Sequence, residues 1–376
     1  MPVKVAPYIE TISPYRPGKP ISEVERELGI YDTIKMASNE NPLGPSPRAV
    51  QAIKDDLKYI HLYPDGNAFY LKHAIMKHLA KYHLRIEEVM VGNGSNEVVD
   101  VLIRTLCTPQ EEILISAQAF LIYEIIAKAA NIPVNLVPLT KDYRFDIPGY
   151  IERINEKTKL ICLVNPNNPT GTYYTKKEFE ELLANVPERC VVLVDEAYFE
   201  YADAPDYPNA LDYRKDFENL VVCRTFSKVY GLSGLRLGYA IGTAQIGELY
   251  RKVRAPFNTN ELAQVAAIAA LEDEEHVRKS IEINHQGKEY FYAELRRLEL
   301  DFLPTQGNFI LVHVGGGETG GIDCYQALLQ EGIIIRPVTN YGFPDWVRIT
   351  IGLPEHNERC LKALEAYLRR KGRIRV

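Results

Sequence analysis

One stretch indicates the fold most clearly: LVVCRTFSKVYGLSGLRLGY, Leu220–Tyr239. Its first residues, Leu220–Cys223, are apolar and predict a buried strand that leads into Ser227 and Lys228. The glycines that follow predict a turn, which ends at Arg236. Two cationic side chains and a hydroxyl are therefore expected beyond the end of one strand.

Two upstream segments repeat this pattern of an apolar strand followed by polar side chains. Val191–Val194 ends in Asp195 and is followed by Tyr198, and Leu160–Val164 runs into NPNNPTG, Asn165–Gly171. In open α/β sheets, ligands bind at the carboxyl ends of the strands. A lysine, a carboxylate, a phenol and an amide delivered there suit pyridoxal phosphate (PLP), which a lysine amine binds covalently.

These motifs resemble those of the fold-type I PLP-dependent aminotransferases, and within them the histidinol-phosphate aminotransferases. Further motifs of the resemblance are SPYRPGKPISEVERELG (13–29), SNENPLGPSP (38–47), LYPDGN (62–67) and IIIRPVTNYGFPDWVRITIG (333–352). They occur in this order over nearly the whole chain. The resemblance implies an α/β fold with a mostly parallel central sheet in a large domain, plus a smaller α/β domain.

Composition places the chain among ordinary globular proteins. Its 376 residues suggest two domains, with 46% hydrophobic and 25% charged residues. The net charge is −6 and the basic residues are scattered, which argues against nucleic-acid or membrane-surface binding, because both need clustered Lys and Arg. The N-terminus lacks an apolar signal core and no run reaches the roughly 18 apolar residues of a membrane span. We therefore expect a soluble cytoplasmic protein.

Cysteine and histidine spacing gives no sign of a metal site. The six cysteines form no CxxC pattern and are expected to be reduced core thiols. The histidines form no HExxH pattern, and His73, His78 and His83 recur at intervals that do not keep them on one helix face. Solvent-exposed positions are the simpler interpretation of these three.

Alternating helix-like and strand-like segments predict a sheet covered on both faces. We expect an N-terminal arm over residues 1–35 that joins the small domain, a large PLP-binding domain over 36–265 and a small C-terminal domain over 266–376. The predicted helices are Ile21–Leu28, Arg48–Leu57, Ala68–Tyr82, Val98–Cys107 and Asn260–Leu300, the last interrupted around Asp273. The predicted strands outside the three described above are Val89–Val91, Glu112–Ser116, Asn308–His313, Ile333–Arg336 and Trp346–Ile351.

The resemblance assigns the catalytic roles. It implies that Lys228 binds the cofactor covalently and, once substrate displaces it, acts as the base that moves a proton. Asp195 is expected to pair with the pyridine nitrogen, and Tyr198 and Asn168 to hydrogen-bond the 3-hydroxyl of the cofactor. Taken alone, a surface-loop lysine, a helix-capping aspartate and a turn asparagine remain open alternatives.

The predicted phosphate site begins at Gly92–Asn96, which follows a strand and precedes a helix. The backbone amides of Ser95 and Asn96 would then lie at a helix N-terminus, a natural anion site. Glu97 stands where a dinucleotide-binding GxGxxG motif needs its third glycine, so a dinucleotide site is disfavoured.

Thr225, Ser227 and Arg236 complete the predicted phosphate site. The resemblance also implies that Tyr63 reaches the phosphate from a neighbouring subunit, which makes the protein a homodimer with shared active sites. Phe120 falls where the family stacks an aromatic ring, commonly tyrosine, on the cofactor. An ordinary core phenylalanine is the alternative for this position.

Two arginines are the candidates for substrate binding. Arg348 lies in the strand-like run Val347–Ile351, where an unpaired arginine would be costly to bury. The resemblance implies that it binds the substrate carboxylate in a two-pronged contact, with an exposed edge-strand arginine as the alternative. Arg336 follows another apolar run and suits a phosphorylated substrate, and Tyr15 in the arm could add a hydroxyl.

The implied reaction transfers the amino group of L-glutamate to imidazole-acetol phosphate, giving 2-oxoglutarate and L-histidinol phosphate in histidine biosynthesis. An aminotransferase for aromatic amino acids and a PLP-dependent threonine-phosphate decarboxylase remain alternatives, because both share the cofactor residues. A PLP-binding regulator without turnover is disfavoured, because no basic patch or DNA-binding extension flanks the predicted fold.

Overall fold

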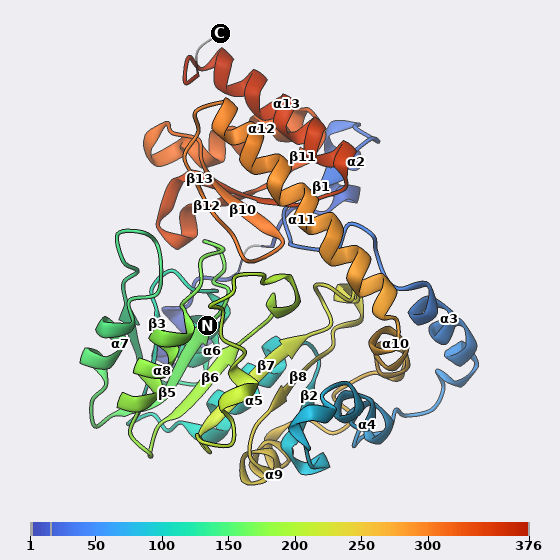
Figure 1. The fold of residues 1–376 in the computed structure, drawn as a ribbon, viewed down its shortest axis with the longest axis vertical. Coiled ribbons are helices and arrows are strands. Elements are labelled where there is room, and N and C mark those ends of the chain that lie inside the picture. Colours follow the sequence, from blue (N-terminus) through green and yellow to red (C-terminus); the bar gives the residue numbers. More distant parts are fainter. Residues whose placement is uncertain (1–2, 16, 375–376) are drawn as a thin grey trace.

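The structure is a computed structural model that describes residues 3–15 and 17–374. Residues 1, 2 and 16 of the predicted arm, and 375 and 376 of the predicted C-terminal domain, lie outside this range. Figure 1 shows two parts, a lower one built on a large sheet and an upper one built on a small sheet. The boundaries predicted at residues 35 and 265 remain predictions.

The large sheet has seven strands in the order β2-β8-β7-β6-β5-β3-β4. The strands are β2 (Val89–Gly92), β3 (Glu112–Ser116), β4 (Val134–Val137), β5 (Thr158–Val164), β6 (Val191–Asp195), β7 (Leu220–Thr225) and β8 (Gly238–Ile241). Only the pairs made by β8 are antiparallel, and all other neighbours are parallel. The predicted mostly parallel central sheet is confirmed.

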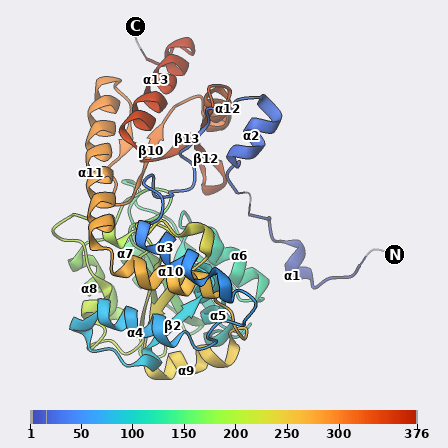
Figure 2. The same ribbon diagram turned by 90° about the vertical axis from the view of Figure 1, so that its right-hand side faces the viewer.

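The central strands are buried on both faces. Every residue of β6 and β7, and all but one of β5, is buried. Successive side chains of a strand point to opposite faces, so this pattern requires helices on both sides of the sheet. The helices of this part, seen in Figures 1 and 2, are α3 (Pro47–Asp56), α4 (Phe69–His78), α5 (Ser95–Leu106), α6 (Ile122–Ala129), α7 (Ile147–Arg153), α8 (Lys176–Asn185), α9 (Ala244–Val253) and α10 (Glu261–Leu271), with α3 packed on α10.

The small sheet is antiparallel, with the order β12-β13-β10-β9. Its strands are β9 (Phe302–Leu303), β10 (Phe309–His313), β12 (Arg336–Val338) and β13 (Phe343–Thr350). The upper part also contains the helices α11 (Glu274–Arg297), α12 (Gly320–Gln330) and α13 (Pro354–Arg370). These elements share a second hydrophobic core, separate from the core of the large sheet.

The N-terminal segment contributes to the upper part. Its helix α1 (Pro7–Glu10) lies beside α6 of the lower part, whereas the predicted helix α2 (Ile21–Leu28) and β1 (Ile34–Lys35) lie in the upper part (Figure 2). Strand β1 pairs in parallel with β11 (Ile333–Ile334), about 300 residues later in the chain. The last residues of the predicted arm are thereby held beside the C-terminal strands.

The structure refines two of the predicted elements. The predicted interruption at Asp273 is confirmed, because its carboxylate caps the first turn of α11 and separates that helix from α10. The predicted strand Ile333–Arg336 instead divides into β11 and β12, which belong to different sheets. The reason is that Ile333 pairs with Ile34, whereas Arg336 pairs with Arg348.

The expected core cysteines and exposed histidines are also found. All six cysteines are buried and free, and His73, His78 and His83 are exposed. Within residues 3–15 and 17–374, no helix combines the length and apolar character needed to cross a membrane. The same residues contain no cluster of three or more side chains suited to hold a metal ion.

Candidate functional site

The carboxyl ends of β5, β6 and β7 open into a cavity of about 270 Å³ beneath the small sheet. The predicted site residues that line it are Tyr15, Ser95, Asn96, Phe120, Asn168, Asp195, Tyr198, Thr225, Ser227, Lys228, Arg236, Arg336 and Arg348. Only Tyr63 among the predicted site residues does not line this cavity. The fold therefore brings together side chains that lie more than 300 residues apart.

Asp195 is the last residue of β6 and faces the cavity. Its Oδ2 accepts a hydrogen bond from the Tyr123 hydroxyl at 2.8 Å, and its Oδ1 accepts one from the Ala197 N–H at 3.1 Å. Burial raises the pKa of Asp195 to about 6, although both hydrogen bonds favour the charged form. A cationic partner in the cavity would stabilise this carboxylate.

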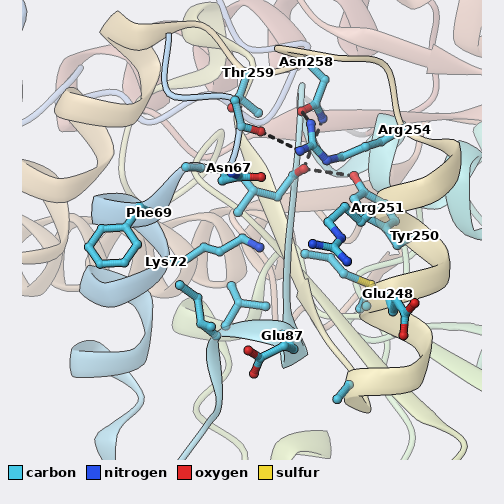
Figure 3. A pocket seen from close by; sticks show the side chains of 18 of the residues that line it. Asn67, Phe69, Lys72, Glu87, Glu248, Tyr250, Arg251, Arg254, Asn258 and Thr259 are labelled. Carbon is cyan, nitrogen blue, oxygen red and sulfur yellow. Dashed lines mark hydrogen bonds between the residues drawn. The ribbon is translucent and has the colours of Figure 1, made fainter.

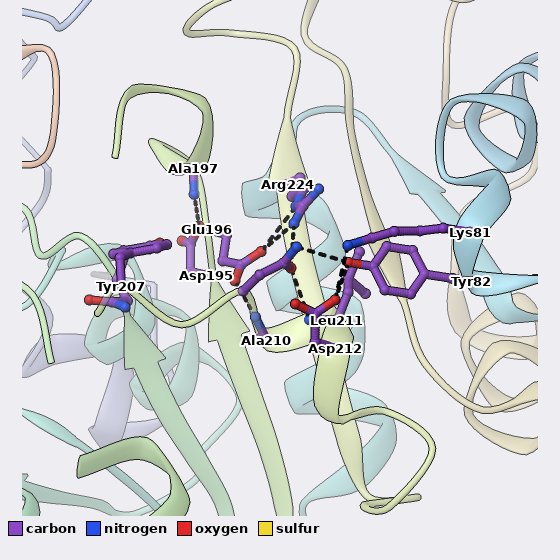
Figure 4. A network of polar contacts seen from close by, with 12 residues as sticks. Lys81, Tyr82, Asp195, Glu196, Ala197, Tyr207, Ala210, Leu211, Asp212 and Arg224 are labelled. Atoms are coloured by element: carbon purple, nitrogen blue, oxygen red, sulfur yellow. Dashed lines mark hydrogen bonds and ion pairs between the residues drawn. The ribbon is translucent and has the colours of Figure 1, made fainter. Parts of the chain in front are cut away.

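The next residue, Glu196, binds to a partner outside the cavity (Figure 4). Its Oε2 accepts two hydrogen bonds from the Arg224 guanidinium, at 2.8 and 3.0 Å. The Arg224 guanidinium also lies 3.8 Å from the centroid of the Phe199 ring. Burial alone would lower the pKa of Arg224, but Glu196, Tyr239 and Glu200 together outweigh it and leave that pKa raised. Asp195 and Glu196 are therefore adjacent in the sequence, but the first faces the cavity and the second pairs with Arg224 outside it.

Lys228 follows β7 and lies beside the ring of Tyr198. Its Nζ donates to the backbone oxygen of Ser38 at 3.1 Å and lies 5.5 Å from the centroid of the Tyr198 ring. Burial and the neighbouring Arg348 charge lower the pKa of Lys228 to about 8. A substantial share of this amine is neutral near pH 8, which suits a nucleophile or a general base.

Tyr198 and Asn168 form one hydrogen-bonded group. The Tyr198 hydroxyl accepts from Asn39 Nδ2 at 2.8 Å and from Asn168 Nδ2 at 3.3 Å. Burial raises the pKa of Tyr198 to about 12, so the phenol stays protonated at neutral pH. The Tyr198 hydroxyl proton therefore remains available to an acceptor in the cavity.

Arg348 extends from β13 and is buried without a carboxylate partner among the described residues. Its Nη1 donates to Asn168 Oδ1 and its Nη2 to the Ala37 backbone oxygen, both at 2.6 Å. Its Nε is buried and has no hydrogen-bond partner in the described part of the chain. Burial lowers the pKa of Arg348. Such a charge is costly unless an anion pairs with it.

Arg336 lies directly opposite Arg348 in the register of β12 and β13. Like charges at opposing positions of a sheet destabilise it, so this pair is suited to an anion held between the two side chains. The Arg336 guanidinium lies 5.6 Å from the centroid of the Tyr15 ring, which meets the Phe120 ring edge-on at 6.2 Å. An aromatic pair thus borders the cationic end of the cavity.

The predicted phosphate site lies at the start of α5. Ser95 and Asn96 form its first turn, where backbone N–H groups have no acceptor within the helix. Arg236 adopts a left-handed backbone conformation, and its Nη1 donates to Ser233 O at 2.9 Å. Gly94 has a positive φ of 83°, which favours glycine, and the guanidinium of Arg236 lies where a Cβ at this position would stand.

Thr225 and Ser227 stand next to this helix start. The Thr225 hydroxyl accepts from the Ser227 N–H at 3.1 Å, and the Ser227 hydroxyl lies 3.5 Å from Nη1 of Arg236. Two hydroxyls, a guanidinium and a helix N-terminus face one end of the cavity, which is a donor set suited to phosphate.

Tyr63 lies away from the cavity of its own chain. Its side chain is 83% exposed, and its ring stacks on Phe257 with centroids 4.8 Å apart. Its predicted contact with a phosphate in a neighbouring subunit remains a prediction.

Sequence reasoning missed the polar residues that support the predicted ones. Asn39 lies in the SNENPLGPSP motif (38–47), so its place in that motif could have marked it as a candidate site residue. Tyr123 carried a weaker signal, because a buried phenol needs a hydrogen-bond partner but the sequence does not say which. Ser38 acts through its backbone oxygen, which no side-chain pattern reveals.

Comparisons with known proteins agree with this geometry. The chain matches the family described as aminotransferase class I and II over residues 31–364. It is 46% identical to a histidinol-phosphate aminotransferase of Anaeromyxobacter sp., covering 96% of this chain and 98% of that one. It is 42% identical to a histidinol-phosphate aminotransferase of Bdellovibrio bacteriovorus, covering 98% and 99%.

A solved structure has the same fold. It is the histidinol-phosphate aminotransferase from Sinorhizobium meliloti in complex with pyridoxal-5'-phosphate, which matches with a TM-score of 0.88 and 24% identity over 98% of both chains. The fold and the relatives at 42–46% identity confirm the resemblance described from the motifs. The chain therefore belongs to the class I and II aminotransferases, and to the histidinol-phosphate aminotransferases among them.

Proposed function

We propose that this protein is a PLP-dependent aminotransferase that transfers the amino group of L-glutamate to imidazole-acetol phosphate. The products are 2-oxoglutarate and L-histidinol phosphate, an intermediate of histidine biosynthesis. One observation carries the proposal beyond the family: Arg336 and Arg348 stand opposite each other in the cavity that contains Lys228 and Asp195. This arrangement suits substrates that carry a carboxylate or a phosphate.

The residues of the cavity fit PLP at three points. The Arg236, Ser227 and α5 donors suit its phosphate, Asp195 suits its ring nitrogen, and Lys228 suits its aldehyde carbon. The close approach of the Arg236 guanidinium to Gly94 supports this fit, because it keeps donors at one end of the cavity. When bound, PLP supplies an aromatic ring that stabilises negative charge on the substrate carbon.

The chain's own groups position protons around that ring. Asp195, with a pKa of about 6, is anionic at neutral pH and can hold a proton on a nitrogen placed beside it. The neutral fraction of Lys228 can take the proton from the substrate carbon. Tyr198 keeps its proton and can donate a hydrogen bond to an oxygen in the cavity.

The arginines account for the choice of substrates. Arg348 can bind the carboxylate of glutamate, since its Nε has no partner among the described residues. Arg336 can add the contacts that a phosphate needs, each contributing about 1.5–3 kcal/mol. The same pair can serve both half-reactions, because the carboxylate and the phosphate are both anions.

A second candidate is an aminotransferase that acts on aromatic amino acids. The observation that favours it is the edge-on contact between Tyr15 and Phe120, which places two aromatic rings beside Arg336. Such a surface accepts a phenyl ring as readily as an imidazole.

The experiment that separates these candidates is a titration of the PLP-loaded protein, monitored by the absorbance of the lysine-bound cofactor. We expect L-histidinol phosphate to remove this band at a far lower concentration than L-phenylalanine. An equal or stronger response to phenylalanine would assign the protein to aromatic substrates. A Lys228→Ala variant, which should bind PLP only noncovalently, is the control, and full activity in that variant would refute the site.

We also propose a homodimer with shared active sites and a cytoplasmic location. The exposed Tyr63 ring, held in place by stacking on Phe257, supports the dimer, because a partner's cavity could receive its hydroxyl. The cytoplasmic location follows from the proposed substrates, since charged phosphate esters do not cross membranes unaided. Sedimentation of the purified protein tests the dimer, and Tyr63→Phe tests whether the hydroxyl contributes to PLP affinity.

A further inference from the structure

A second cavity lies between α4 and α9, outside the site described above. Its volume is about 480 Å³, and it shares no lining residue with the candidate active site. Figure 3 shows Lys72 of α4 and Arg251 of α9 pointing toward each other across it, with Arg254 above them. Two cationic side chains from two helices, and a third from the residue that follows α9, therefore meet in one cavity.

The cationic groups are not neutralised by ion pairs. Among the described residues, Lys72, Arg251 and Arg254 form no salt bridge, and Lys72 and Arg251 form no side-chain hydrogen bond. Within the described part of the chain, Arg254 donates only to neutral acceptors, which include the backbone oxygen of Gly66 and, at 2.9 Å, Oδ1 of Asn258. These contacts fix the direction of its guanidinium and leave its positive charge uncompensated.

The nearby carboxylates do not outweigh these charges. Glu87 and Asp65 raise the pKa of Lys72, but burial, Arg254 and Arg251 act more strongly, and the pKa is lowered. Asp65 is already engaged, because its two oxygens accept from the N–H groups of Asn67 and Phe69. The carboxylate of Glu248, which also lines the cavity, is paired with Lys252 at 3.4 Å.

The remainder of the cavity wall is largely apolar. Met90 and Val91 of β2 are buried side chains that line it, and Phe69 and Ile86 line it as well. A simple inorganic anion would leave this apolar surface without a partner. A ligand with an anionic group and a flat apolar body would contact both parts of the wall.

We propose that this cavity binds an organic phosphate monoester, whose phosphate contacts Lys72, Arg251 and Arg254 and whose apolar body packs on Met90 and Val91. A phosphate carries close to two negative charges at neutral pH, which suits three cations better than a single carboxylate does. Arginine also matches the oxygens of phosphate in two-pronged contacts. The proposal does not depend on the reaction assigned to the other cavity.

The test uses phenyl phosphate as the probe and calorimetric titration of the PLP-loaded protein. Because the candidate active site also suits phosphate, the titration is made in the double variant Arg336→Gln, Arg348→Met. We expect one phenyl phosphate to bind per chain, about ten-fold more tightly than inorganic phosphate or phenylacetate. Absence of binding, or equal affinity for either simpler probe, would overturn the proposal.

Substitutions within the cavity then locate the site. Adding Lys72→Met or Arg251→Gln to the double variant should each weaken binding about ten-fold. Lys77→Met, on the exposed face of the same helix, is the matched control and should leave the affinity unchanged. Thermal unfolding of each variant verifies folding. Unchanged affinity in both cavity variants would overturn the proposal, and so would equal loss in the control.

Discussion

Arg224 and Arg348 are both buried arginines near the end of β6, and they differ in what balances their charge. Arg224 lies outside the candidate active site, where Glu196 accepts two hydrogen bonds from it. Arg348 lies in the cavity, where among the described residues its hydrogen bonds go only to an amide oxygen and a backbone oxygen. A buried charge that pairs with a counterion of the protein itself contributes to the stability of the fold. A buried charge that has no such counterion indicates a ligand that supplies one.

The largest effect expected from this contrast concerns Arg348→Met. Loss of two charge-assisted hydrogen bonds to a substrate carboxylate should lower kcat/KM for glutamate by about 10²–10⁴-fold. The free energy of unfolding of the PLP-free protein should stay the same or rise, because an uncompensated buried charge is removed. Steady-state kinetics and urea unfolding measure the two quantities. Arg348→Lys is the matched control for geometry, and a large loss of stability in Arg348→Met would break the comparison.

Glu196→Gln should have the opposite profile. The substitution keeps the shape of the side chain but leaves Arg224 buried without its counterion, which should cost about 3–5 kcal/mol of unfolding free energy. The kcat of the folded variant should change little, since Glu196 does not line the candidate active site. Glu275→Gln, in an exposed pair with Lys279, is the control and should have no measurable effect on stability. An equally small effect at Glu196 would mean that the buried pair does not support the fold.

A pH series on the protein and its Asp195→Asn variant should isolate the contribution of Asp195 to stability. The pKa of about 6 in the folded protein lies above the usual value, so the folded state holds this proton more tightly. The stability of the PLP-free protein should therefore fall as pH rises from about 4 to about 6, by about 2–3 kcal/mol from this group. Asp195→Asn should lack this loss and be more stable above pH 6, with no difference near pH 4.

Tyr123→Phe sharpens this test. It removes a hydrogen bond that favours the charged form of Asp195, so the fall in stability should extend to higher pH. Urea unfolding across the same pH range measures it. An unshifted profile would mean that the Tyr123 hydroxyl does not stabilise the carboxylate.

The smallest effect is expected from Arg336→Ala, and it concerns selectivity. We expect the half-reaction with the phosphorylated substrate to slow by about 10–100-fold, the equivalent of one charge-assisted contact. The half-reaction with glutamate should change much less, because Arg348 remains. Single-turnover measurements of each half-reaction provide the comparison. Equal losses would make Arg336 a general anion-binding or structural residue.

The sequence predicted the residues at strand ends better than it predicted their supports. Asp195 and Lys228 follow apolar runs that predict buried strands, so their approach to one cavity follows from the topology of parallel sheets. The Tyr123 hydroxyl reaches Asp195 through the packing of α6 on the sheet, which local pattern does not encode. The division between β11 and β12 was missed because the apolar run is continuous, while its two halves pair with segments far apart in the chain.

The pairing of β1 with β11 has a consequence for how the protein is made. Asn39, which holds the Tyr198 hydroxyl, also binds Thr350 across 311 positions of the chain, and Arg348 binds the Ala37 oxygen across the same separation. During synthesis, the large sheet can form while the ribosome is still adding the last strands. The candidate active site cannot be completed until almost the entire polypeptide has emerged. A nascent chain should therefore gain most of its fold before it gains any capacity for catalysis.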